Sequence, residues 1–219
     1  MTRTQICLGG LAGVLGVLLI GNSFAINMGL PLTATDGELL RYAVSHERQV
    51  MVAAWMQAVG PVLIACCALT ICALSDRLTR LPGILLALGL MTLVMTSLLE
   101  TVCYMAALFS APTAMPRIAN EFGHAVQHLY FTVAAPGVFL PLGAVLLSSR
   151  ILPRAYGLTA LGLGGTFFAL GIACLSDLVL PNTVTALAAV QALWWLLAAA
   201  TLILKAPRLA TSPHVGLAA

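Results

Sequence analysis

The chain has 219 residues, of which 61% are hydrophobic and 8% charged, and its mean hydropathy is +1.04. Soluble domains carry about 25% charged residues, so the composition excludes an ordinary soluble domain and predicts an integral membrane protein. The net charge of +3 is spread over predicted loops, which excludes a nucleic-acid-binding surface.

Six long apolar runs predict six transmembrane helices in a single transmembrane domain that covers residues 1–219. Their predicted bounds are 6–28, 49–75, 81–108, 122–147, 155–180 and 183–204. The fold class is therefore all-α, a polytopic six-helix bundle. An alternative interpretation of the first run is a cleaved signal peptide, with Ser23-Phe24-Ala25 as the cleavage site.

The segments between these runs carry local signals. Thr35-x-x-Glu38 fits a capping box and predicts a short interfacial helix in the first loop. The turns at 76–80 and 148–154 are short, which predicts antiparallel hairpins of helices two and three and of helices four and five. Prolines inside spans two and four are expected to kink them and to free backbone carbonyls; they are Pro61, Pro136 and Pro141.

The distribution of basic residues predicts the orientation. Seven lie on the side of the termini, namely Arg3, Arg77, Arg80, Arg150, Arg154, Lys205 and Arg208. Three lie on the other side, namely Arg41, Arg48 and Arg117. By the positive-inside rule, both termini are predicted to be cytoplasmic.

Two acidic residues lie inside predicted spans. Glu100 follows Leu81 by nineteen residues, about 28 Å at ~1.5 Å per residue, and Asp177 falls at a similar depth in span five. Asn22 and His46 are expected in the same outer third, and Tyr104 lies one turn beyond Glu100. Such residues predict a site for a proton or a polar ligand. The alternative is a protonated Glu100 that bonds to Tyr104 and only stabilises the bundle.

The start of span four holds a pattern that suits a metal ion. Glu121, His124 and His128 stand at i, i+3 and i+7, so they share one helix face, and Glu100 is a candidate to complete the set. Imidazole and carboxylate suit a divalent metal such as zinc, iron or manganese. Alternatively, His124 is simply solvated at the interface. A haem held by His46 and His128 is a weaker alternative.

The remaining polar and sulfur-containing residues have simpler interpretations. The six cysteines lie in apolar runs without C-x-x-C spacing and are interpreted as small hydrophobes, although Cys103 and Cys174 share the outer half and their pairing stays open. Gln57, Gln191 and the tryptophans within spans are interpreted as packing residues with satisfied polar edges.

The second half of the chain resembles a known family. The features are the His-bearing helix that opens this half, the turn Ser149-Arg150-Ile151-Leu152-Pro153-Arg154 before a Gly-rich helix, and Asp177 ahead of a Leu-Pro-Asn turn. These features, in residues 122–205, are similar to those of the DUF4386 family, bacterial six-helix membrane proteins of unknown function. The resemblance implies the bacterial inner membrane and carries no activity.

The sequence thus predicts a membrane protein whose outward-facing polar pocket binds an ion or a small ligand. One alternative is an intramembrane metal-dependent hydrolase that uses Glu121, His124 and His128. Another is an accessory subunit without a site of its own. The expected partners are the lipid bilayer and a membrane protein or a second copy of the chain, and not nucleic acid.

Overall fold

A computed structural model of the chain describes residues 1–27, 35–109, 122, 125–126, 128–149, 151–174 and 181–211. Within these ranges, the side chains of Asn27, Asp36, Leu39, Leu40, Ala43, Tyr104, 107–109, Cys174 and 181–185 lie outside the description. In the described part the chain is helical, and six of its helices are long and apolar enough to cross a membrane. The predicted six-helix, all-α architecture is confirmed.

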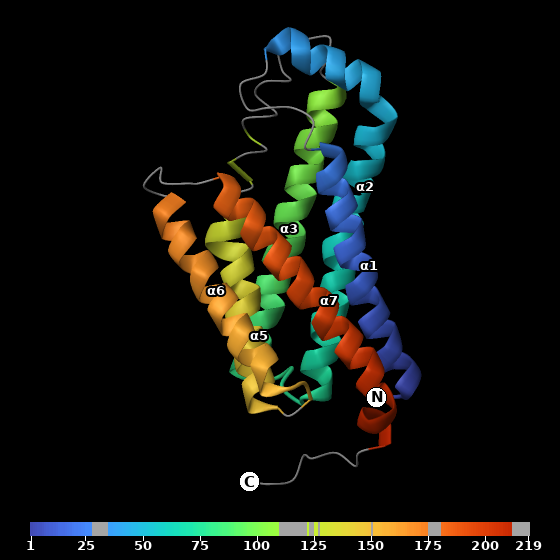
Figure 1. Ribbon diagram of the computed structural model, residues 1–219, viewed down its shortest axis with the longest axis vertical. Coiled ribbons are helices and arrows are strands. Elements are labelled where there is room, and N and C mark those ends of the chain that lie inside the picture. The colour runs from blue at the N-terminus through green and yellow to red at the C-terminus, as the bar shows by residue number, and fades with distance from the viewer. Residues whose placement is uncertain are drawn as a thin grey trace.

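The elements follow one another along the bundle (Figure 1). They are α1 (Arg3–Asn27), α2 (Asp36–Leu74), α3 (Leu81–Phe109), the π-helical turn η1 (Tyr130–Ala134), α5 (Ala135–Ser148), α6 (Arg154–Cys174) and α7 (Pro181–Thr211). The start of α1 and the end of α7 lie at one end of the molecule, here called the termini end. The start of α2 lies at the opposite, distal end.

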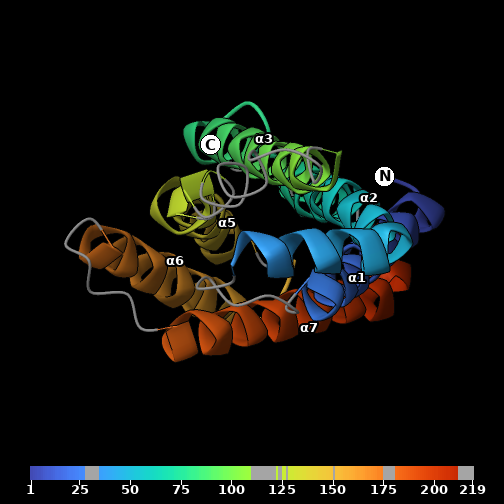
Figure 2. The same cartoon turned by 90° about the horizontal axis from the view of Figure 1, so that it is seen from above.

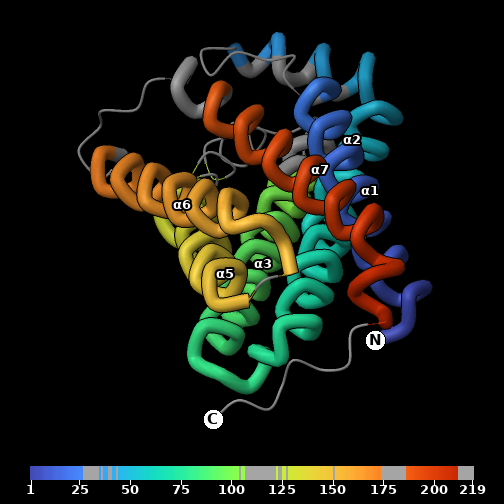
Figure 3. The backbone as a smooth tube through the Cα atoms, turned by 60° about the horizontal axis from the view of Figure 1, so that its bottom comes forward, coloured from blue at the N-terminus to red at the C-terminus, as the bar shows by residue number. Residues whose placement is uncertain are grey.

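From α1 to α6, each helix packs against the next one along the chain, whereas α7 returns to pack against α1. The predicted pairs α2–α3 and α5–α6 are confirmed, and α3 packs on α5 to join them. The last helix, α7, packs mainly on α1 and contacts α6 only briefly (Figure 3). The bundle is therefore a curved row of helices in which α3 occupies a central position between α2 and α5.

The long helix α2 bends where it enters the bundle. Its first part lies across the distal end (Figure 2), and the backbone leaves helical geometry at His46, with φ −121° and ψ 16°. Thr35 donates its backbone N–H to Oε2 of Glu38 at 2.7 Å, so the predicted capping box and the helix in the first loop are confirmed, while the interfacial location of that helix stays a prediction. Tyr42 stacks on the His46 ring and donates its hydroxyl to the carbonyl of Ile26, which fastens the segment to α1.

Several element bounds differ from the sequence prediction. The second helix begins at Asp36 and not at residue 49, because the helix of the first loop continues into the span through the bend at His46. The fourth span contains η1 immediately before Pro136, because a proline without an N–H removes one rung of the helical ladder and favours a wider turn there. The last helix continues to Thr211, past the predicted end at residue 204 and through Pro207. Residues 175–180 of the predicted fifth span lie outside the described residues.

Close backbone approach brings α3 against α5. Gly89 lies so near Gly137 that an added Cβ would overlap the Gly137 carbonyl oxygen. That carbonyl is four residues before Pro141, so it has no helical N–H donor, and the Gly89 Cα instead faces it. The glycine therefore permits the tight packing of α3 on α5 at this point.

Candidate functional site

A proline in α2 creates the first interhelical hydrogen bond of the site. Pro61 has no N–H, so the carbonyl of Gln57, four residues earlier, loses its helical donor. Ser97 of α3 donates its hydroxyl to this carbonyl at 2.6 Å. In an apolar bundle without water, this bond stabilises α2 and fixes its register against α3.

That register places a buried glutamine beside the only acidic residue of span three. Glu100 is one turn beyond Ser97, and Nε2 of Gln57 donates to its Oε2 at 2.7 Å. The exposed fractions are 5% for Gln57 and 6% for Glu100, so both side chains lie inside the bundle. An ionisable group is costly to bury at this depth. Ionisable residues inside membrane spans are therefore rare and commonly belong to functional sites.

Further hydroxyl groups satisfy the backbone around this pair. Ser23 of α1 donates to the carbonyl of Ala53 at 2.9 Å, and Thr101 of α3 donates to the carbonyl of Ser97 at 2.9 Å, with Ala54 as a second acceptor at 3.3 Å. These side chains connect three helices around one layer of the bundle. We call Ser23, Gln57, Ser97, Glu100 and Thr101 the polar cluster.

One buried atom of the polar cluster has no partner. Oε1 of Gln57 is fully enclosed and accepts no hydrogen bond, and Ser149 Oγ is the only other such buried side-chain atom among the described residues. Because Nε2 of the Gln57 amide donates to the Glu100 carboxyl, the oxygen of the same amide is the atom that lacks a hydrogen-bond partner. A buried acceptor without a donor costs about 1–3 kcal/mol, so its presence beside an acidic residue needs an explanation.

A second polar pair lies across the bundle from the polar cluster. The hydroxyl of Tyr130, in η1, donates to Oε1 of Gln191 in α7 through a short hydrogen bond. π-Helical turns recur at functional sites, and η1 positions this tyrosine.

The predicted site residues take different positions. Asn22 is exposed and donates to the carbonyl of Leu18 in its own helix, and the ring of His46 contacts Ser45 and Tyr42 at the bend of α2. His128 is exposed. Glu100 is therefore the one predicted site residue with a described side chain that belongs to the polar cluster.

The remaining predicted positions lie outside the description. They are Glu121, His124 and Asp177, together with the side chains of Tyr104 and Cys174. Within the described residues, no three His, Cys, Asp or Glu side chains gather where they could hold a metal ion. The metal site stays a prediction, and so does the Cys103–Cys174 pairing, although Cys103 itself is a buried free thiol.

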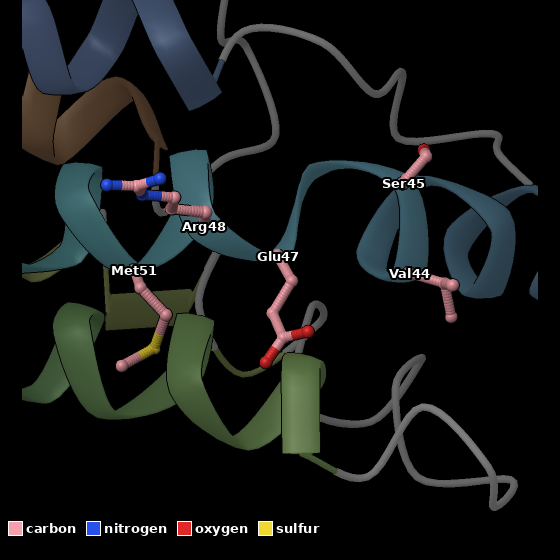
Figure 4. A pocket seen from close by; sticks show the side chains of 5 residues that line it. All are labelled: Val44, Ser45, Glu47, Arg48 and Met51. Atoms are coloured by element: carbon pink, nitrogen blue, oxygen red, sulfur yellow. The ribbon is translucent and has the colours of Figure 1, made fainter.

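A shallow depression lies at the bend of α2 (Figure 4). It has a volume of about 570 Å³ and is lined by Val44, Ser45, Glu47, Arg48 and Met51. The side chains of Glu47 and Arg48 point in different directions, and both are exposed. Their charges do not converge on a common point, so the polar cluster remains the better candidate.

Trp194 and Trp195 are buried, as the packing interpretation predicts, whereas Trp55 is 57% exposed, so that interpretation is wrong for Trp55. Trp194 is 6% exposed and donates Nε1–H to the hydroxyl of Thr159 at 2.9 Å, and it packs edge-on against Phe139 and Trp195. Gln57 differs from the predicted packing residue with a satisfied polar edge, because its Nε2 donates to Glu100 while its Oε1 has no partner. The sequence signal for this position is Pro61, which leaves the backbone carbonyl of Gln57 without a helical donor. That carbonyl then needs a donor from a neighbouring helix.

Comparison with protein-family models, with curated proteins and with solved structures finds no match for this chain.

Proposed function

We propose that this chain is a bacterial inner-membrane protein that binds a small ligand at Gln57 and Glu100. The observation that carries the proposal is the enclosed Oε1 of Gln57, which has no donor, beside the buried Glu100 carboxyl. A binding site leaves such a group unsatisfied until its ligand arrives, because the ligand supplies the missing hydrogen bond. The six apolar helices support the membrane location.

The orientation and family are part of the same proposal. The excess of basic residues at the termini end supports cytoplasmic termini, which makes the distal end face outward. Glu100 lies nine residues from the distal end of α3, about 14 Å at ~1.5 Å per residue, and nineteen residues from its other end. The ligand therefore enters from the outer side. The resemblance to the DUF4386 family agrees with this location and adds no chemistry.

A carbodiimide that dissolves in the membrane tests whether Glu100 belongs to an accessible site. The reagent attaches to buried carboxyl groups that small molecules can reach, and peptide mass spectrometry locates the adduct. We expect modification at Glu100 in the full-length protein and its loss in the Glu100→Gln variant. If Glu100 stays unmodified while exposed Glu47 reacts with a water-soluble carbodiimide, the pair is sealed and only stabilises the bundle. That result would support the accessory-subunit alternative.

A further inference from the structure

The hydroxyl groups of the polar cluster have already used their hydrogens. Ser23, Ser97 and Thr101 all donate to backbone carbonyls, at 2.9, 2.6 and 2.9 Å. A hydroxyl has a single hydrogen, so these three groups satisfy the helices and have no hydrogen left for a ligand. A ligand that only accepts hydrogen bonds would therefore find no donor in these side chains.

The amide of Gln57 has the opposite capacity. Its Nε2 donates to Oε2 of Glu100 at 2.7 Å, which holds the amide in place, while its Oε1 is enclosed and has no partner. The exposed fraction of Gln57 is 5%, so this oxygen lies inside the bundle. An enclosed acceptor without a donor is costly. The site therefore lacks an O–H or N–H group directed at Oε1.

A second unused group lies on α3. Thr96 is 5% exposed and stands one turn before Glu100, so both side chains project from one face of the helix. Thr92 and Thr101 donate to carbonyls four residues earlier in α3, whereas the Thr96 hydroxyl makes no hydrogen bond to any described residue. A hydroxyl can donate or accept. Thr96 is therefore available to donate to the oxygen of a bound group.

A ligand hydroxyl fits both unused groups, because its one oxygen donates and accepts. A carbonyl or an ether oxygen only accepts, so it would leave Oε1 of Gln57 without a donor. A protonated amine brings three N–H groups, but Oε1 of Gln57 is the one buried side-chain atom without a partner in the described part of the polar cluster. A single O–H group therefore matches the site better than either.

The layers on both sides of the polar cluster describe the rest of the ligand. The buried side chains one turn away on α2 and α3 are apolar; they are Ala53, Pro61, Leu93 and Cys103. A sugar or another polyol would bury several hydroxyl groups against these layers, and each one without a partner is costly. One hydroxyl on an apolar body meets a polar layer between apolar ones, and such a molecule dissolves in the bilayer.

We infer that the ligand of this site is a membrane-dissolved alcohol, a neutral molecule with one hydroxyl on an apolar body. Its O–H donates to Oε1 of Gln57, and its oxygen accepts from the Thr96 hydroxyl. Glu100 positions the amide through the hydrogen bond from Nε2. This inference rests on the proposed function and names the class of ligand.

A photoreactive probe tests this class on the unaltered protein. Decanol that carries a diazirine in its chain would be added to the full-length protein in lipid nanodiscs, and peptide mass spectrometry would locate the label. We expect saturable labelling of the peptides that contain Gln57 and Glu100, and competition by unlabelled decanol. Decyl methyl ether has the same chain and oxygen without the O–H. It is expected to compete at least about tenfold more weakly, because it leaves a buried acceptor without a donor.

Variants test the two binding residues separately. Gln57→Met removes the amide, and Thr96→Val removes the hydroxyl at nearly the same shape. Each is expected to weaken saturable labelling by about three- to tenfold, the loss that follows when one hydrogen bond is removed. Thr92→Val is the matched control on α3, since its hydroxyl already donates to Leu88, and it should leave labelling unchanged. Circular dichroism and gel filtration would confirm that each variant retains the fold.

Several results would overturn the alcohol assignment. They are equal competition by decyl methyl ether, stronger competition by decylamine than by decanol, and unchanged labelling in Gln57→Met or in Thr96→Val. Absence of saturable labelling would also overturn it. Each of these results would leave the proposed ligand site standing if Glu100 still reacts with the lipophilic carbodiimide. An unreactive Glu100 in that experiment, by contrast, would remove the site itself.

Discussion

The hydrogen bond between Ser97 and the Gln57 carbonyl should be coupled to Pro61. Ser97→Ala removes the donor that replaces the missing N–H of the proline and leaves a buried carbonyl unpaired. An unpaired buried acceptor costs about 1–3 kcal/mol, whereas interhelical bonds in membranes average about 0.6 and reach about 1.7 kcal/mol. We therefore expect Ser97→Ala to lower the free energy of unfolding by about 1.5 kcal/mol, near the upper end of the membrane range.

In a Pro61→Ala background the expectation changes. Residue 61 then has an N–H that donates to the Gln57 carbonyl, so Ser97→Ala should cost less than about 0.5 kcal/mol. The double-mutant cycle should thus give a coupling energy of about 1 kcal/mol. The unfolding free energies can be measured by titration with denaturing detergent in mixed micelles, with tryptophan fluorescence as the signal.

The matched control is on the same helix. Thr92 is half-buried and donates its hydroxyl to the carbonyl of Leu88 within α3 at 3.0 Å, not to another helix, so Thr92→Ala should change stability little and show no coupling to Pro61. Equal costs of Ser97→Ala in the two backgrounds would refute the reasoning, because the serine would then not be replacing the proline's missing donor.

Three other predictions concern packing, pH and orientation. Gly89→Ala should destabilise the bundle by about 1–3 kcal/mol, because its Cβ would overlap the α5 backbone, whereas Gly162→Ala meets nothing within 4 Å and should be tolerated in the same unfolding assay. The cap hydrogen bonds from the Thr35 backbone and side chain lower the pKa of Glu38, so their stabilisation is present above the ordinary carboxyl range and is lost as pH falls through the lowered value. Corrected amide exchange in residues 36–45 should therefore accelerate at low pH, and a pH-independent rate would contradict this. In a cysteine-free background, a membrane-impermeant maleimide added to spheroplasts should label Ser45→Cys and not Thr79→Cys; the reverse pattern would invert the proposed orientation.

The sequence predicts the apolar spans well because a bilayer imposes a simple length and composition on them. It also predicts the cap at Thr35 and the freed carbonyl before Pro61, since both depend on residues close in the chain, whereas the departure from helical geometry inside α2 lies at His46 and not at Pro61. The bend at His46 and the turn η1 were missed. Both are places where tertiary packing selects among local geometries that the residues alone permit.

The site is harder to predict because it depends on register between helices. Glu100 is recognisable from its depth alone, but its partner Gln57 lies 43 residues away on another helix. Pro61 and Ser97 together indicate the register of α2 against α3. Pro61 frees the carbonyl of Gln57, and the Ser97 hydroxyl on the neighbouring helix can donate to it. The predicted metal ligands Glu121 and His124 lie outside the described residues, so that hypothesis stays a prediction.

The most direct test of the ligand site is an experimental density map of the protein purified in lipid nanodiscs. We predict a non-protein density at hydrogen-bonding distance from Oε1 of Gln57, about 2.7–3.2 Å, while Nε2 of the same amide bonds to Glu100. A protein donor on Oε1, with no added density, would contradict the proposed ligand site.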